Sequence, residues 1–390
     1  MRILLYVPSP WFGSGYGVAC KNIVPRLKRY GHEVLVFSPT QHGTAKIHWG
    51  EFEVVGIKNQ RYGTDALPEY VQEYQPDVVI TLYDEWVLGS WQEILGDIYL
   101  PWVVGHYDPM EPLLKTAVEK TWRQLALSEW GARIMREAGL DPRVVPLGVD
   151  PQEFRPVVGY LDSLGQLIDQ KELKKSVGAF EDQFLVGMVA ANIDFRKNME
   201  AQIRVFADFN RKYKDTHLFI KTNPSADAGG WDINRMVNKV CGLSEGNPRA
   251  PISFPASDSC DVPVQQLCLW YNAFDVYLSC SITEGWGLPI TEANACGVPA
   301  IFTNFGAMPE AGYGWAVDGH RELNILYSFG VRPDEQGIWN ALEAAYKLRG
   351  TPEMAAMKVA AREHALQYNW DSVVERLNKE LEEWQMDKPL

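Results

Sequence analysis

The chain has 390 residues, of which 46% are hydrophobic and 22% are charged. These values exclude a largely disordered chain, and the length suits two domains rather than one compact α/β core. The formal net charge of −13 argues against nonspecific binding to DNA or RNA, because phosphate backbones are bound by clustered Lys and Arg.

The cysteines and the first residues indicate a reducing compartment. The six cysteines include no C-x-x-C pair, so we expect reduced core residues rather than disulfides. The first residues, RILLYVP, run directly into a turn, and we expect a β-strand rather than a signal peptide. No apolar run approaches the roughly 20 residues that a membrane span needs. We therefore expect a cytoplasmic protein, and peripheral membrane contact and oligomeric state stay open.

Short apolar runs alternate with helical periodicity in the first part of the chain. The helical patterns at 18–31 and 130–139 each end at a Gly, as helices commonly do. Alternation of this kind predicts a parallel sheet covered on both faces. The predicted strands are 2–8, 32–39, 77–83, 101–106, 123–128 and 143–148.

A glycine-rich loop, PSPWFGSGYG, follows the first predicted strand and contains Gly15 and Tyr16. Glycines let a ligand approach the backbone closely, and the N-terminus of the following helix favours anions. The spacing is G-x-G-x-G rather than G-x-G-x-x-G, and the second strand ends in Ser and Pro rather than in an acidic residue. The dinucleotide fingerprint of a nicotinamide oxidoreductase is therefore missing.

The sequence HYDP, 106–109, follows another predicted strand. His106 is suited to hydrogen-bond a sugar hydroxyl or the charge that develops at a reaction centre, and Asp108 is suited to orient it or an acceptor. A purely structural role for either residue stays open.

The strand pattern restarts near residue 184 after a looser, Pro- and Gly-containing stretch at 150–183. A second doubly wound unit is predicted from this restart. Its expected strands are 185–191, 216–222, 251–255, 276–280 and 299–303, with a helix at 199–213. We predict an N-terminal domain at 1–155, a C-terminal domain at 156–369 and a final helix at 370–390.

Two adjacent cations, Arg196 and Lys197, follow the first strand of the second unit. Adjacent cations in a loop ahead of a helix are suited to bind phosphate oxygens, and cations fixed beside a group that gains negative charge in a reaction stabilise its transition state more than its ground state. The alternative is a pair of solvated surface cations.

The most informative stretch is EGWGLPITEANACG, which places Glu284 and Glu292 eight positions apart around a Gly-rich turn. Pro289 lies near the start of the predicted helix and Gly297 lies just past its end. The free N–H groups of such a helix start attract phosphate, and a carboxylate one turn further along is suited to accept from both ribose hydroxyls. The stretch predicts half of a pocket for a nucleotide diphosphate.

This stretch resembles the Glu-x7-Glu signature of the retaining GT-B glycosyltransferases of family four, the glycosyltransferases group 1. Most other stretches named above also have counterparts in that family. The resemblance implies an α/β chain of the GT-B fold, with two Rossmann-like doubly wound domains facing across a cleft and a final helix packed on the first. It also implies a nucleotide diphosphate sugar as donor, a hydroxyl acceptor, and neither a metal nor another cofactor.

The resemblance also implies roles for single residues. Glu292 is expected on the ribose, and Glu284 on the transferred sugar. Lys197 matches the pyrophosphate Lys of the family. The family's Arg normally stands five residues earlier, at Asn192 here, so Arg196 is the candidate that replaces its charge. The expected catalytic residues are His106, Arg196, Lys197 and Glu284; the expected donor-binding residues are Gly15, Asn192, Gly285, Trp286, Gly287, Leu288 and Glu292; Tyr16 and Asp108 are weaker acceptor-binding candidates.

Three alternatives share the predicted pocket. A sugar-nucleotide epimerase of the GT-B fold would need no acceptor, and a non-catalytic binder of sugar nucleotides or glycans would release no nucleotide. A glycosyltransferase acting on modified DNA is disfavoured by the acidic balance. The nucleotide base, the sugar and the acceptor stay unidentified.

Overall fold

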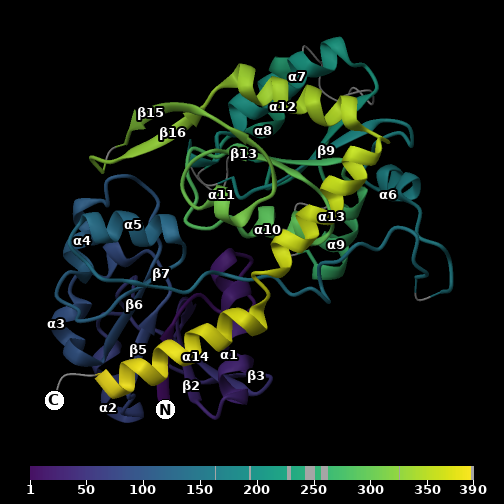
Figure 1. Cartoon of the computed structure of the whole chain (residues 1–390). Helices are drawn as coiled ribbons and strands as arrows, with labels where there is room; N and C mark the ends of the chain where they lie inside the picture. Colours follow the sequence, from purple (N-terminus) through teal and green to yellow (C-terminus); the bar gives the residue numbers. More distant parts are fainter. Residues whose placement is uncertain are drawn as a thin grey trace. The chain divides into compact units, whose positions relative to one another are not determined.

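The computed structural model describes residues 1–162, 164–192, 195–225, 230–241, 251–255, 262–324 and 326–387 (Figure 1). The chain forms two compact units. Unit 1 comprises Met1–Gly148, Leu323–Phe329 and Tyr368–Leu390, and unit 2 comprises Val149–Glu322 and Gly330–Gln367.

The division falls after Gly148, whereas the sequence placed the boundary after residue 155. The reason lies in the packing of the connecting segment. Val149, Phe154 and Val157 are buried in the same hydrophobic cluster as Phe274 and Tyr277 of unit 2, so this segment belongs to the core that it helps to fill.

Unit 1 is built on an eight-stranded sheet in the order β3-β4-β2-β1-β5-β6-β7-β8. All neighbours pair in parallel except β3 and β4, which form an antiparallel pair. The six predicted strands are confirmed, while β3 and β4 were not predicted. The strands are β1 Arg2–Tyr6, β2 Glu33–His42, β3 Ile47–Trp49, β4 Phe52–Ile57, β5 Val78–Thr81, β6 Tyr99–Val103, β7 Leu125–Ala126 and β8 Arg143–Val144.

Helices cover the sheet of unit 1, and the last helix of the chain packs against the first (Figure 1). Asp371 of this last helix pairs with Arg26, at 2.9 Å, and with Arg29, at 2.8 Å. The helices are α1 Gly15–Arg29, α2 Leu67–Tyr74, α3 Trp91–Leu95, α4 Pro112–Val118, α5 Glu129–Glu137 and α14 Trp370–Asp387, with short 3-10 turns η1 Glu85–Val87 and η2 Gly96–Ile98.

Unit 2 holds a six-stranded parallel sheet in the order β11-β10-β9-β12-β13-β14. Five of these strands were predicted and β14 was not. The strands are β9 Phe184–Val189, β10 Thr216–Lys221, β11 Ile252–Ser253, β12 Val276–Ser279, β13 Ala300–Thr303 and β14 Gly314–Val317; β15 Gly319–Leu323 and β16 Phe329–Pro333 form a separate two-stranded ribbon.

The two faces of this sheet are covered by separate hydrophobic clusters, so the sheet is buried on both sides. The helices of the unit are α6 Gln170–Ser176, α7 Met199–Lys212, α8 Ile233–Cys241, α9 Val264–Ala273, α10 Leu288–Ala295, α11 Met308–Ala311, α12 Glu335–Leu348 and α13 Pro352–Leu366, with the 3-10 turn η3 Phe195–Lys197. Across the described part of the chain, no helix combines the length and the apolar character needed to cross a bilayer.

Each sheet has one point where the strand order reverses. This switch point lies between β1 and β5 in unit 1 and between β9 and β12 in unit 2. Loops at the carboxyl ends of the two strands at a switch point diverge, which leaves a crevice in which ligands of such sheets bind. The residues predicted from the sequence follow these strands or their neighbours.

Candidate functional site

A three-residue ion cluster lies at the switch point of unit 2. Arg196 and Lys197 follow β9, and Glu284 follows β12, so the two flanking loops meet here. Glu284 accepts from Arg196 Nη1 at 2.8 Å and from Lys197 Nζ at 2.7 Å. The backbone joins the loops as well, because Ile282 N–H donates to the Arg196 carbonyl oxygen at 2.7 Å. The cations are therefore fixed in place and are not loosely solvated.

The charge state of Glu284 follows from this cluster. Glu284 is 7% exposed, and burial alone would raise its pKa. The opposite charges of Lys197 and Arg196 outweigh burial and hold the pKa at about 2. Glu284 is thus ionised at neutral pH and is suited to accept hydrogen bonds rather than to give a proton.

The turn after Glu284 leads directly into α10. Gly287 is the N-cap residue and has φ +107°, a left-handed conformation that favours glycine, and Leu288 and Pro289 begin the helix. Trp286 and Leu288 are buried, and Gly285 lies with them in the same turn. The turn is also held from outside, since Ala307 N–H donates to the Glu284 carbonyl oxygen at 3.2 Å.

Glu292 has a different set of partners. It lies in α10, is 6% exposed and accepts from the Tyr271 hydroxyl of α9 at 2.8 Å. Burial raises the pKa of Glu292 to about 7, although Tyr271 and the charge of Lys221, at the end of β10, act against the rise. A carboxylate with this pKa is ionised at little energetic cost near neutral pH. Additional hydrogen-bond donors would stabilise its ionised form.

Asn192 holds a neighbouring loop together. Its side-chain nitrogen donates to the carbonyl oxygens of Trp231, at 2.7 Å, and Asn223, at 3.0 Å, and its side-chain oxygen accepts from Trp231 N–H at 2.9 Å. Asn192 is 4% exposed. These hydrogen bonds show that Asn192 stabilises the loop. Its expected contact with the nucleotide sugar stays a prediction.

The glycine-rich loop of unit 1 meets the loop after β5 at the other switch point. Gly15 is the first residue of α1, and the Tyr16 hydroxyl donates to Asp84 Oδ1 at 3.1 Å. Beside them, Glu85 is fully buried and accepts from Thr81, at 2.6 Å, and from Tyr99, at 2.7 Å.

Burial raises the pKa of two carboxyl groups in this part of unit 1. The pKa of Glu85 rises to about 8, with Thr81 and Tyr99 acting against the rise. The pKa of Glu111 rises to about 7, and the charge of Asp84 adds to the effect of burial. The acid-rich character of this switch point contrasts with the cations of unit 2.

His106 and Asp108 lie together in the loop that follows β6. Both are half-buried. Asp108 Oδ2 pairs with Arg133 Nη2 of α5 at 3.2 Å, and its backbone exchanges two 3.0 Å hydrogen bonds with Phe329. The structure therefore groups Gly15, Tyr16, His106 and Asp108 in unit 1 and the remaining predicted residues in unit 2.

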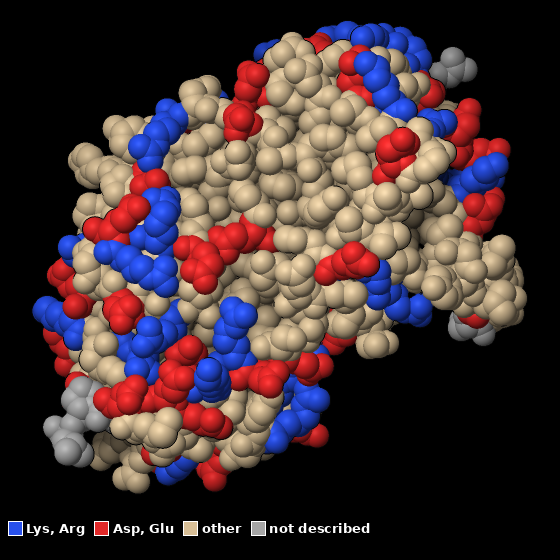
Figure 2. Space-filling view, in the orientation of Figure 1, with Lys and Arg blue, Asp and Glu red and all other residues tan. Residues whose placement is uncertain are grey.

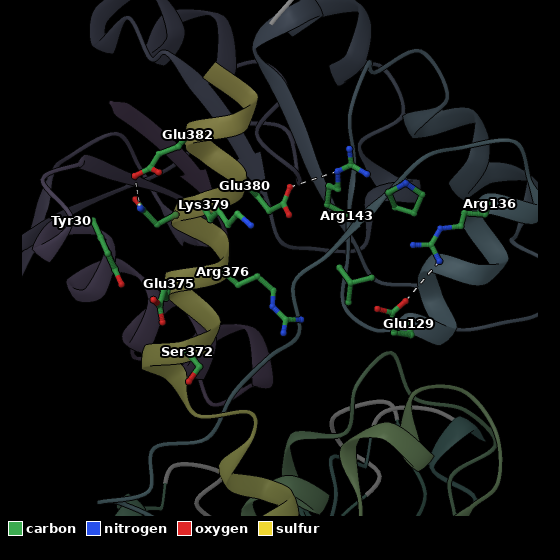
Figure 3. Close-up of a pocket in the computed structure, with 13 residues that line it drawn as sticks. Tyr30, Glu129, Arg136, Arg143, Ser372, Glu375, Arg376, Lys379, Glu380 and Glu382 are labelled. Atoms are coloured by element: carbon green, nitrogen blue, oxygen red, sulfur yellow. Dashed lines mark hydrogen bonds and ion pairs between the residues drawn. The ribbon is translucent and has the colours of Figure 1, made fainter. Parts of the chain in front are cut away.

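A cavity of about 830 Å³ in unit 1 contains none of the predicted residues. Figure 3 shows that it lies between α14 and the elements α5 and β8, with charged side chains from both sides. Arg143 faces Glu380 at 3.8 Å and Arg136 faces Glu129 at 3.7 Å, so much of this charge is paired within the lining.

The segment that carries the unit 2 turn matches a known family. Residues 261–312, which include Glu284 and Glu292, match the family model of the glycosyl transferases group 1. Over these residues the chain is similar to the group 1 glycosyl transferases. The resemblance noted in the sequence is confirmed at this level.

Curated proteins that are similar to this chain include a named glycosyltransferase and a glycolipid synthase. D-inositol 3-phosphate glycosyltransferase of Corynebacterium jeikeium (strain K411) is 26% identical over 250 residues, which cover 62% of this chain and 51% of that protein. Alpha-monoglucosyldiacylglycerol synthase of Streptococcus pneumoniae (strain ATCC BAA-255 / R6) is 21% identical over 320 residues, covering 74% of this chain and 67% of that protein. The chain thus spans about half to two thirds of the length of these two relatives.

Solved structures of other proteins share the fold of this chain. Sucrose-phosphate synthase from Thermosynechococcus elongatus superposes with a TM-score of 0.72 at 16% identity, covering 98% of both chains. The Anabaena protein HepE, solved with UDP and glucose, gives a TM-score of 0.71 at 16% identity and covers 98% of this chain and 100% of its own. The fold class is therefore GT-B, with two Rossmann-like units, as the sequence predicted.

Sequence reasoning missed two residues that hold the predicted ones. Tyr271 lies in a run of apolar residues that reads as ordinary core, so nothing marked it as the partner of Glu292. Asp84 was detectable, because it directly follows the predicted strand 77–83 and so stands where ligand-binding residues of such sheets occur.

Proposed function

We propose that the protein is a glycosyltransferase that moves a sugar from a nucleotide diphosphate sugar to a hydroxyl acceptor. The observation that carries the proposal is the fixed Arg196–Lys197–Glu284 cluster at the β9/β12 switch point, in a chain related to the group 1 glycosyl transferases. The names of the relatives support the reaction class.

Arg196 and Lys197 are assigned to the diphosphate. Arg196 and Lys197 place a guanidinium and an ammonium group side by side at Glu284, and these groups form charge-assisted hydrogen bonds with phosphate oxygens. Both cations are half-buried, where a charge is screened less than on the surface. They are fixed before the donor arrives, so the charge that develops on the leaving phosphate is met without reorganisation.

Glu284 and the turn after it are assigned to the transferred sugar. Glu284 is ionised at neutral pH, so we assign it acceptance of hydrogen bonds from sugar hydroxyls and not proton donation. The backbone of Gly285 to Leu288 leads into the start of α10, where N–H groups without an intrahelical partner favour anionic oxygens.

Glu292 is assigned to the ribose of the donor. Its carboxylate already accepts one hydrogen bond from Tyr271 and retains capacity for two more. Two ribose hydroxyls match this capacity. Tyr271 then acts as a positioning residue, because it fixes the orientation of the carboxylate from α9.

Unit 1 is assigned to the acceptor. Tyr16 and Asp84 offer a hydroxyl and a carboxylate at its switch point, and His106 and Asp108 lie in a neighbouring loop. His106 is assigned to the reacting sugar. We further propose that the reaction retains the anomeric configuration, with the leaving phosphate taking the acceptor's proton, and that it needs no metal.

A nucleic-acid acceptor is disfavoured by the charge pattern. Figure 2 shows acidic and basic side chains interspersed over the face that it presents, rather than a continuous basic stripe. Binding to a phosphate backbone depends on such a stripe. A glycan, a lipid-linked sugar or a small hydroxyl compound suits the acidic net charge of −13 better.

The test is a panel of UDP, GDP, ADP and dTDP in thermal unfolding, with and without EDTA. A nucleotide that binds only the folded chain stabilises it by about 2.7 kcal/mol at 100 times its Kd. We expect one nucleotide to raise the Tm equally in both conditions, and its sugar derivative to release nucleotide when a hydroxyl acceptor is added. No shift with any of the four would overturn the proposal, and release without an acceptor would indicate a different enzyme.

A further inference from the structure

Two buried thiols lie one helical turn away from the Tyr271–Glu292 hydrogen bond. Cys268 of α9 and Cys296, the C-cap residue of α10, are both free, with their Sγ atoms 4.0 Å apart. They are 5% and 4% exposed. A disulfide needs an S–S distance of about 2.05 Å, so the sulfurs have to approach by about 2 Å.

The two thiols differ in acidity in the manner of an attacking and a resolving cysteine. The hydrogen bond from Cys296 lowers the pKa of Cys268 to about 7, although burial acts against it, and Asn272 contributes a further donor at 3.6 Å. Burial raises the pKa of Cys296 well above its ordinary value. Cys268 therefore supplies the thiolate, which is the reactive form, while Cys296 keeps its proton.

We propose that Cys268 and Cys296 form a reversible disulfide that weakens nucleotide binding in unit 2. The first part of the proposal, which we call the chemical half, is that the disulfide forms, and it is argued from the positions of the two thiols. The second part, the regulatory half, is that the disulfide weakens nucleotide binding, and it rests on the proposed function. The oxidant is a peroxide, and the product is a covalent link from α9 to α10.

The reaction balances in two steps. Cys268 thiolate attacks one oxygen of hydrogen peroxide, the O–O bond breaks, and a sulfenic acid and hydroxide form. The Cys296 sulfur then attacks the Cys268 sulfur, the S–O bond breaks and a second hydroxide leaves. The two hydroxides take up the two thiol protons as water. Two electrons pass from the two sulfurs to the peroxide.

The link would act on Glu292 through two short helices. Cys268 precedes Tyr271 by three residues in α9, and Cys296 follows Glu292 by four in α10, so the sulfur pair and the hydrogen-bonded pair join the same two helices one turn apart. The hydrogen bond is already 2.8 Å long, so it cannot shorten with the sulfurs. We expect the link to displace the Glu292 carboxylate and so to weaken binding that depends on its position.

The first experiment detects the bond itself. The full chain is treated with hydrogen peroxide, denatured and alkylated, and the alkylated thiols are counted by mass spectrometry. We expect the count to fall from six to four, to return with dithiothreitol, and to yield a cross-linked peptide pair carrying Cys268 and Cys296. A peptide map without this pair overturns the proposal.

Matched variants show which thiols are needed. Cys268→Ser and Cys296→Ser should each abolish the cross-linked pair. If the buried hydroxyl of Cys268→Ser prevents folding, Cys268→Ala replaces that variant. Cys241→Ser, at the half-buried end of α8, should leave the pair intact. Loss of the pair in the Cys241 variant would contradict the assignment.

The second experiment measures the Tm shift that a nucleoside diphosphate produces in reduced and oxidised chain. We expect the shift to disappear on oxidation, to return with dithiothreitol, and to persist after peroxide in the Cys296→Ser variant. An unchanged shift in fully cross-linked chain overturns the regulatory half. No shift even in reduced chain overturns the proposed function instead, while the cross-link result still decides the chemical half.

Discussion

The two switch points of the protein have the same topology and opposite chemistry. In unit 2 the loops after β9 and β12 bring Arg196 and Lys197 against one carboxylate. In unit 1 the loops after β1 and β5 bring Tyr16 against Asp84, with buried Glu85 beside them. Sheets of this kind bind ligands at the switch point, and the side chains of the loops there decide which charge of ligand is favoured. On this basis we propose a diphosphate as the ligand of unit 2 and a hydroxyl compound as the ligand of unit 1.

The largest effect should come from removing a cation in unit 2. Lys197→Ala is expected to lower kcat about 10²–10³-fold, because the charge on the leaving phosphate loses a fixed partner. Steady-state kinetics with the sugar derivative of the nucleotide that the thermal panel selects measures this. Lys175→Ala, at an exposed cation of α6, is the control and should leave kcat unchanged. Full turnover by Lys197→Ala would remove the cation site from the reaction.

Removing the carboxylate of Glu292 should weaken donor binding more than turnover. A hydrogen bond to a charged group contributes about 1.5–3 kcal/mol, so Glu292→Ala is expected to raise the donor KM about 10- to 100-fold. Calorimetric titration with the nucleoside diphosphate separates binding from catalysis. Glu172→Ala in α6 is the matched exposed control. An unchanged KM would detach Glu292 from the ribose.

A change at the switch point of unit 1 should spare the nucleotide. Asp84→Asn is expected to raise the acceptor KM about tenfold, since one charged hydrogen-bond acceptor is lost. The Kd of the nucleoside diphosphate should stay as in the wild type. Asp97→Asn, at an exposed residue of η2, should change neither constant. A higher Kd for the nucleoside diphosphate in Asp84→Asn would contradict the assignment of the acceptor to unit 1 and the nucleotide to unit 2.

Nucleotide affinity should depend on pH through Glu292. Ribose hydroxyls donate to the ionised carboxylate, and the pKa of Glu292 in the free protein is about 7. Affinity is therefore expected to fall as pH drops from 8 to 6, by at most about tenfold for each pH unit below the pKa. Titrations across this range test it. The slope should vanish in Glu292→Gln, and a slope that persists there would assign the pH dependence to another group.

A separate effect concerns the stability of unit 1. The pKa of Glu85 rises from 4.5 to about 8 on folding, so its contribution to stability is complete below pH 4.5 and is lost as pH rises toward 8. The loss is at most about 1.4 kcal/mol for each pH unit. Urea unfolding at pH 5 and pH 8 should show a smaller difference in Glu85→Gln than in wild type. Exposed Glu93→Gln should behave as wild type, and an unchanged difference in Glu85→Gln would contradict the raised pKa.

The local sequence pattern was sufficient to predict an element when the pattern lies within a single strand or turn. The predicted strands of both sheets are confirmed, and the Gly287 turn lies where the stretch 284–297 placed it. Three strands of the sheets were missed, of which β4, Phe52–Ile57, is six residues long and carries a detectable apolar run. β3 is only three residues long, and β14 begins at Gly314 in a stretch with little alternation, so neither has enough periodicity to stand out from a loop.

The sequence by itself determined the class of the protein. Alternating apolar runs predict two doubly wound sheets, and the stretch that carries Glu284 and Glu292 lies within the residues that match the group 1 glycosyl transferases. Both are local properties of the chain, because side-chain periodicity and turn chemistry depend on neighbouring residues.

Only the tertiary structure decided how these residues act together. It joined Arg196 and Lys197 to Glu284 across 87 or more positions of sequence, set Tyr271 on Glu292, and brought Cys268 within 4.0 Å of Cys296. The charge of a buried group depends on burial and on the partners around it. Those partners come from other strands and helices, and the sequence does not show which of them will meet.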